Sequence, residues 1–166
     1  HRDISKLKSE VRSMKEMMVK SPDIRAQYYH PEIALNKHLQ LHTYLVCDRY
    51  GVDYELVLGV MFAESSFRQK VTNKNLNGSI DYGLMQINDI NLEKFKDMGY
   101  TDIMNPYQNI EFGVYLLSQR QNNFKDEHAI ISSYKYGVNG YKKLVNKGYK
   151  TTDYSIKVLS YRRGLK

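Results

Sequence analysis

The chain has 166 residues, one cysteine and a net charge of +7, and residues 135–166 alone hold nine Lys or Arg against one acid. The length suits one domain with a core of its own and a short appendage, while a single cysteine excludes an internal disulfide framework and a cysteine metal cluster. No apolar stretch approaches the roughly 18 residues of a membrane span, and without an initiator Met or a signal-like segment we expect an excised or processed piece of a longer protein, with any membrane anchor outside it.

Residues 1–22 are predicted to form a polar helix with a narrow apolar stripe. Its apolar residues recur at three- and four-residue steps, at Ile4, Leu7, Val11, Met14 and Met18. This pattern is typical of a coiled coil but falls short of the ~3–4 heptads of a firm assignment. Pro22 breaks the helix because its nitrogen has no hydrogen to donate. We therefore expect a stalk capable of weak self-association, a linker over residues 23–31, and a domain over 32–166.

From residue 33 onward the pattern is helical almost throughout. One helix is expected to end at Gly51, and Asp53 is suited to cap the next, whose apolar run continues to Ala63. Leu, Met and Ala outnumber β-branched residues in this run, which favours a helix over a strand. Further helices are expected at NLEKF (91–95), after NPYQN (105–109), at DEHAIISSY (126–134) and at TTDYSIKVLSY (151–161). The loop 68–82 is expected to hold at most a small β-hairpin, so the predicted fold class is mainly α.

Glu64 stands at the end of the apolar run and is the first candidate for chemistry. In a helix that begins near Asp53, it continues the face formed by Val57, Val60 and Met61. The last turn of a helix disfavours negative charge, and partial burial raises the pKa of a carboxyl as well. Both effects favour the protonated form near neutral pH, as a general acid for glycoside cleavage requires. The alternative is a glutamate that simply turns to solvent.

The segment DYGLMQIN (81–88) places the amide of Gln86 within an apolar run. An amide buried without a partner costs ~1–3 kcal/mol, so either a sugar group or a backbone group is expected to pair with it. Tyr makes up fifteen of the aromatic residues and Phe the other five. Tyr offers a flat apolar face with a hydroxyl, which suits carbohydrate clefts and helical cores alike.

Five motifs carry a resemblance to a known family. They are ESSF from Glu64, GLMQIN from Gly83, NPYQNIEFGVYLL from Asn105, SSYKYGVNG from Ser132 and YSIKVLSY from Tyr154. In this order, over roughly residues 32–162, the chain resembles soluble lytic transglycosylase (SLT) domains of the goose-lysozyme-like superfamily. The resemblance implies a lysozyme-like helical fold that cleaves the β-1,4 bond between MurNAc and GlcNAc of peptidoglycan. It also implies an extracellular or cell-envelope location and a bacterial or phage origin.

The resemblance implies a role for five residues. Glu64 is the implied catalytic acid, and the implied substrate-binding residues are Met85, Gln86, Tyr134 and Tyr154. Tyr154 shares a helical face with two other apolar residues, so a core role is open to it as well.

Two positions depart from the pattern of the family. Lys135 replaces the Asn that usually follows the tyrosine, and Asn73 stands where a serine is frequent. Both departures concern the expected sugar contacts and leave the expected acid in place.

The implied reaction needs one carboxylate, whereas most glycoside hydrolases need two. Glu64 would protonate the leaving oxygen and then accept the proton of the MurNAc C6 hydroxyl, which gives 1,6-anhydroMurNAc. Goose-type lysozymes use aspartates, one of them at the position of Asn88 in this chain. A hydrolytic muramidase that uses Asp81 or Asp89 is therefore an alternative, and so is a non-catalytic cell-wall-binding module.

Metal and nucleic-acid sites are not expected. The five histidines do not fall in H-E-x-x-H or similar spacings, so we predict no metal site and no cofactor. No nucleic-acid motif accompanies the basic C-terminal segment, so we predict no nucleic-acid partner. The expected partners are peptidoglycan glycan strands, together with anionic wall polymers that the basic segment could bind.

Overall fold

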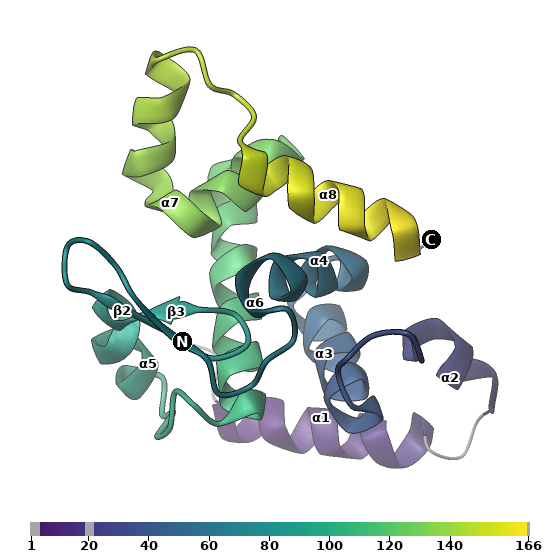
Figure 1. Cartoon of the computed structure of the whole chain (residues 1–166). Coiled ribbons are helices and arrows are strands. Elements are labelled where there is room, and N and C mark those ends of the chain that lie inside the picture. Colours follow the sequence, from purple (N-terminus) through teal and green to yellow (C-terminus); the bar gives the residue numbers. More distant parts are fainter. Residues whose placement is uncertain (1–3, 19–21, 166) are drawn as a thin grey trace.

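Helices dominate the structure, a computed structural model that describes residues 4–18 and 22–165 (Figure 1). The helices of these ranges are α1 (Ile4–Met18), α2 (Pro22–Tyr28), α3 (Lys37–Tyr50), α4 (Tyr54–Ser65), α5 (Leu92–Asp97), α6 (Pro106–Asn123), α7 (Glu127–Asn146) and α8 (Asp153–Leu165). The mainly α prediction is thus confirmed. None of the helices in the described part of the chain has the length and apolar character needed to cross a membrane.

Helix α4 is buried because it is apolar on nearly every side, as a helix surrounded by protein must be. Leu58, Val60 and Met61 are fully buried in it, and α8 and α3 pack against it. The approach of α8 is close, since a Cβ on Gly59 would lie 2.7 Å from the carbonyl oxygen of Val158. Asp53 caps the first turn by accepting a hydrogen bond from the backbone N–H of Leu56, as predicted.

Helix α3 ends as the sequence indicates, at Gly51 in the left-handed conformation. Its Cys47 is a free thiol with 1% of its surface exposed. Burial raises the pKa of this thiol well above its ordinary value, and nearby carboxylates add to the effect. Cys47 is therefore an unreactive core residue.

Helix α1 packs against the domain rather than standing apart from it. Ile4, Leu7 and Val11 are buried in the same hydrophobic core as residues of α3 and α6, and α1 lies across these helices in Figure 1. Arg49 of α3 also forms an ion pair with Glu10, at 2.6 Å between Nε and Oε2.

These contacts correct the expectation of a stalk outside the core. The apolar stripe of α1 is covered by its own chain, because the spacing of a stripe does not reveal which helix will cover it. The expected linker over 23–31 is corrected as well, since much of it forms α2 and Tyr28 is buried. Self-association through α1 stays a prediction, now without an exposed stripe to support it.

A small antiparallel sheet follows α4. Its strands, in the order β1–β2–β3, are Thr72–Lys74, Ile80–Tyr82 and Ile87–Asn88. The register pairs Asn73 with Asp81 and Asp81 with Asn88. The predicted hairpin is present, with LNGS in its turn, and β3 adds a strand too short to show any alternation in sequence. A 3-10 turn (Asp89–Asn91) then leads into α5.

Candidate active site

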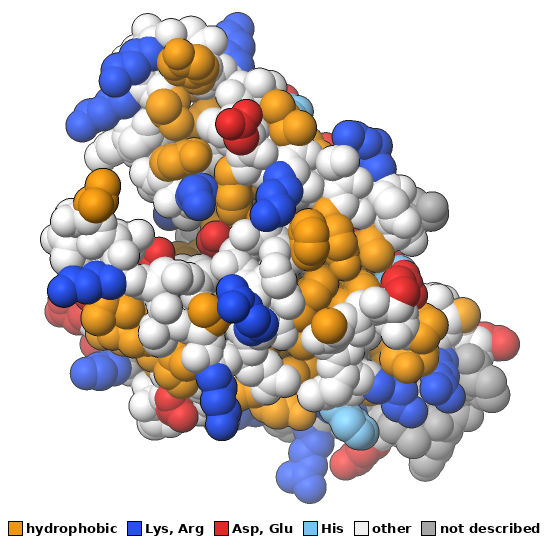
Figure 2. All heavy atoms as spheres, viewed as in Figure 1, with side chains coloured by type: hydrophobic (Ala, Val, Ile, Leu, Met, Phe, Trp, Pro, Cys, Tyr) orange, Lys and Arg blue, Asp and Glu red, His pale blue; other side chains and the backbone are white. Residues whose placement is uncertain are grey.

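The groups that act on the Glu64 carboxyl come from β2, α7 and α8, so the C-terminal end of α4 lies where these elements meet. Helix α7 bends at Gly137, and its second half turns away from the body of the molecule (Figure 1). Figure 2 shows the surface hollowed between α7 and the strands, with acidic side chains in the hollow. The predicted acid thus lies where elements that are distant in sequence meet.

Glu64 is half-buried, and its pKa is far from the ordinary value. Burial is the largest cause of the shift. The combined effect of burial and of the neighbouring groups raises the pKa of Glu64 from 4.5 to about 7. Lys135 opposes this rise most, Asp81 adds to it, and the Tyr154 hydroxyl and Lys157 lower the pKa further. The carboxyl is therefore protonated in a large share of molecules near neutral pH, which suits a group that must both give and take a proton.

Ser65 fixes the end of α4. Its side chain is 1% exposed, and its Oγ lies 2.7 Å from the carbonyl oxygen of Leu84 and 3.1 Å from that of Met61. The next two residues, Ser66 and Phe67, both have a left-handed backbone, which stops the helix abruptly. The residue after Glu64 is therefore held against the GLMQ segment, and the orientation of the acid depends on that segment.

Asn109 of α6 holds the GLMQ segment from the other side. Its buried side chain accepts a hydrogen bond of 2.8 Å from the N–H of Met85 and donates one of 2.8 Å to the carbonyl of Tyr82. Gly83 has φ 75°, and a Cβ there would lie 2.6 Å from Asn109 Nδ2, so glycine is required on both counts. The sequence reasoning did not single out Asn109. An amide beside the apolar stripe of its helix, next to Ile110, was the signal that could have found it.

Gln86 has internal partners for its whole amide. Its Nε2 donates to the carbonyls of Gly83 at 2.9 Å and Val71 at 3.2 Å, and its Oε1 accepts from Asn73 Nδ2 at 2.7 Å. Of the two partners that the sequence left open for this amide, the structure thus provides the backbone. Asn73, which departs from the family pattern, provides the remaining hydrogen bond. A substrate contact of Gln86 stays a prediction.

Met85 and Tyr134 are joined by a hydrogen bond between the GLMQ segment and α7. The Met85 side chain is fully buried, and its carbonyl accepts a hydrogen bond of 2.6 Å from the Tyr134 hydroxyl. Burial raises the pKa of this hydroxyl well above its ordinary value, and the nearby Glu64 charge adds to the effect. Tyr134 thus ties α7 to the GLMQ segment. Substrate contacts of these two residues stay predictions, and the Met85 side chain lies in the core.

Tyr154 is both a core residue and a neighbour of the acid. It is 6% exposed, and its hydroxyl lacks a well-aligned hydrogen-bond partner among the described residues, although it lies close enough to Glu64 to lower the pKa of that carboxyl. On the same face of α8, Tyr161 stacks on Phe62 of α4 at 4.2 Å between ring centroids. The core role and the site role that the sequence left open are therefore compatible.

The two candidate second acids are both engaged in the sheet. Asp81 accepts hydrogen bonds from the side-chain amides of Asn88 at 2.8 Å and Asn75 at 3.1 Å. Asp89 accepts one of 3.1 Å from the backbone N–H of Ile80. Asn88, at the position of the lysozyme aspartate, is thus a donor to Asp81. Among the described residues, no group of His, Cys, Asp and Glu is arranged to hold a metal ion.

Comparisons with known proteins bear on the family and fold of the chain. Residues 46–157 match the Transglycosylase SLT domain family. Protein IpgF of Shigella flexneri is 30% identical over 99 residues, which cover 58% of this chain and 65% of that protein. Invasion protein IagB of Salmonella typhimurium is 24% identical over 103 residues, which cover 60% and 64%. The chain thus matches slightly less than two thirds of the length of these relatives.

A solved structure gives the fold comparison. An inactive mutant of Lytic Transglycosylase Slt from Pseudomonas aeruginosa superposes with a TM-score of 0.55 at 20% sequence identity, over 95% of this chain and 28% of that one. This likeness confirms the predicted lysozyme-like helical fold.

Proposed function

Because the chain belongs to the transglycosylase SLT family, we propose that it cleaves the β-1,4 bond between MurNAc and GlcNAc in peptidoglycan and leaves 1,6-anhydroMurNAc ends. The observation that carries this proposal is the state of Glu64. It is a half-buried carboxyl at the end of a helix, with a pKa of about 7, where groups from β2, α7 and α8 act on it. The proposed site of action is the cell envelope, where such strands are found.

The proposed reaction uses Glu64 twice. The protonated carboxyl donates its proton to the glycosidic oxygen as the bond to the MurNAc anomeric carbon breaks, and GlcNAc leaves as the alcohol. The carboxylate then accepts the proton of the C6 hydroxyl of the same MurNAc, whose oxygen bonds to the anomeric carbon. Glu64 ends protonated, and no water is consumed. Since nucleophile and electrophile belong to one sugar, the closure benefits from proximity.

The surroundings of Glu64 support this sequence of proton transfers. A pKa near 7 lets one carboxyl serve first as acid and then as base at neutral pH. The connections of Ser65 and Tyr134 to the GLMQ segment hold the acid's surroundings without help from the substrate. Such preorganisation is what a site on rigid elements offers to catalysis.

Hydrolysis of the same bond is the second candidate, and the electrostatic influence of Asp81 on Glu64 favours it. A hydrolase needs a second carboxylate to activate water. Asp81 accepts hydrogen bonds from two asparagine side chains, one on each carboxylate oxygen, so both oxygens are engaged within the protein rather than free to orient a water molecule. The cyclising route, which does not need Asp81, is therefore preferred.

The test is mass spectrometry of purified peptidoglycan after digestion, with the Asp81→Asn protein in parallel. We expect products lighter by one water than reducing muropeptides, resistant to borohydride, and still formed by Asp81→Asn. Reducing MurNAc ends that disappear with Asp81→Asn would identify a muramidase instead. Intact glycan bound by the folded protein would indicate a wall-binding module.

A further inference from the structure

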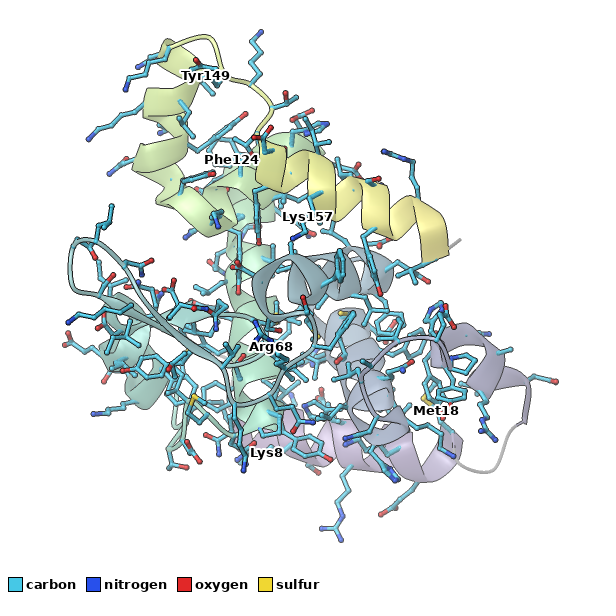
Figure 3. The ribbon with its side chains drawn as sticks, in the orientation of Figure 1. Lys8, Met18, Arg68, Phe124, Tyr149 and Lys157 are labelled. Atoms are coloured by element: carbon cyan, nitrogen blue, oxygen red, sulfur yellow. The ribbon has the colours of Figure 1, made fainter. Side chains whose placement is uncertain are left out.

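Two lysines from different helices flank the Glu64 carboxyl. Lys135 on α7 is exposed, and its Nζ lies 4.9 Å from the centroid of the Tyr154 ring. Lys157 on α8 is also exposed, and its Nζ lies 5.3 Å from the centroid of the Phe62 ring, on the side of α8 that looks toward α4 (Figure 3). Both ammonium groups lower the pKa of Glu64, so both lie within electrostatic reach of it.

Neither lysine takes part in any of the ion pairs found among the described residues. Each has an aromatic ring beneath its charge, which supports the stem and leaves the ammonium group open to a ligand. When Glu64 holds the proton that it must donate, it carries no charge to balance them. The two positive charges that act on Glu64 then have no counter-charge on that carboxyl.

Resting on the proposed function, we propose that Lys135 and Lys157 form a carboxylate-binding pair for the acidic arm of the muramyl sugar beside the scissile bond. That arm carries a carboxylate either on its lactyl group or, when a peptide is attached, on the peptide stem. A flexible ammonium group suits an anion whose position varies with the length of the arm. Lys135 replaces the Asn that the family usually has, so this recognition would be a property of this chain rather than of its fold.

Binding at the lysine pair would also act on the acid. The groups that face Glu64 are Lys135 from α7, Lys157 and Tyr154 from α8, and Asp81 from β2, with Tyr134 beneath. An anion between the lysines offsets their effect and adds its own, so the pKa of Glu64 rises in the complex. A substrate with its carboxylate in place would therefore favour the protonated acid that the first step needs.

The test measures binding, so that it does not depend on turnover. Two proteins are compared: Glu64→Gln alone, and Glu64→Gln combined with Lys135→Asn and Lys157→Gln. Each is titrated with strands that have free stem carboxylates, strands with amidated stems, stem-free strands with lactyl carboxylates, and a neutral GlcNAc oligomer. Glu64→Gln with Lys142→Asn, an exposed lysine elsewhere on α7, is the matched control. A further variant combines Glu64→Gln with Lys135→Arg and Lys157→Arg. It keeps both charges, so it is expected to bind acidic strands about as well as the Glu64→Gln parent.

We expect the double lysine change to weaken binding of acidic strands at least about fivefold and to reduce its salt dependence, with no change for the neutral oligomer. If binding weakens only for strands with free stem carboxylates, the peptide carboxylate is the group that the two lysines bind. If it weakens for stem-free strands, the lactyl carboxylate is that group. Equal loss on the neutral oligomer, or no loss on any glycan, overturns the inference. If wild-type protein cleaves no strand while these binding differences hold, the proposed reaction fails and the carboxylate pair stands.

Discussion

The Ser65 hydroxyl donates a hydrogen bond of 2.7 Å to the carbonyl of Leu84, which joins the residue after Glu64 to the GLMQ segment. These two residues lie on opposite sides of the hairpin in sequence. Through this bond, the end of α4 is fixed to the GLMQ segment. The acid is therefore positioned by tertiary contact as much as by its own helix.

Ser65→Ala is expected to loosen this connection. The change leaves the buried Leu84 carbonyl without its side-chain donor, which costs about 1–3 kcal/mol of unfolding free energy. We expect turnover on glycan strands to fall even well below the melting temperature of the variant, where the loss of unfolding free energy leaves nearly all molecules folded. Ser9→Ala, at an exposed position of α1, is the control. Full activity of a destabilised Ser65→Ala protein would contradict a positioning role.

Glu64→Gln is expected to reduce the rate of glycan cleavage by about 10²–10⁴-fold, because the amide keeps the shape of the side chain but cannot transfer the proton. Glu55→Gln, on the same helix, is expected to retain activity. Circular dichroism checks that both proteins fold. Near wild-type cleavage by folded Glu64→Gln would remove Glu64 from the catalytic role.

The same substitution is expected to change how stability depends on pH. The folded-state pKa of Glu64 is about 7, above its ordinary 4.5, so the folded protein binds the proton more tightly than the unfolded chain. The associated stability is present below pH 4.5 and is lost as the pH rises to 7. Urea unfolding should therefore show Glu64→Gln gaining on wild type across this window, by up to about 3 kcal/mol at about pH 8. A constant difference across the whole window would mean that the carboxyl titrates normally.

Cleavage is expected to decline as the pH rises through about 7, because Glu64 must start protonated. Lys135 lowers the pKa of this carboxyl, so Lys135→Asn should move the declining limb of kcat/KM to higher pH. Lys142→Asn should leave the limb in place. A limb that stays in place in Lys135→Asn would show that the Lys135 charge does not act on the acid.

Leu7→Ala tests the position of α1. Leu7 is 2% exposed in the common core, so its truncation should cost about 2–5 kcal/mol of unfolding free energy, whereas Lys6→Ala should cost little. Deletion of residues 1–22 should lower stability by more than Leu7→Ala does, because it uncovers α3. Unchanged thermal unfolding of the truncated protein would restore the idea of an independent stalk.

The sequence predicted what short-range chemistry determines. Asp53 and Gly51 mark helix boundaries because a cap or a left-handed residue acts within one turn. The identity of Glu64 as candidate acid followed from its place after an apolar run, together with the motif resemblance. Its raised pKa was also expected, since burial at a helix end acts in one direction.

Features that depend on distant partners were not predictable in the same way. The apolar stripe of α1 did not reveal that α3 would cover it. The amide of Gln86 indicated that a partner was needed, but only the fold shows that Asn73 and the backbone provide it. Asn109 was missed because two of its three hydrogen bonds reach Tyr82 and Met85, which the sequence does not place beside α6.

Because Cys47 is buried, its reaction with a thiol reagent can report local opening of the core around α3. A thiol reagent can reach this residue only in molecules in which α3 has left the core, and no second thiol competes for it. The rate of labelling thus measures how often the core opens around α3 under native conditions. A glycan that binds only the closed form would slow labelling in proportion to its occupancy, so affinity could be measured from a single cysteine on a different helix from the acid.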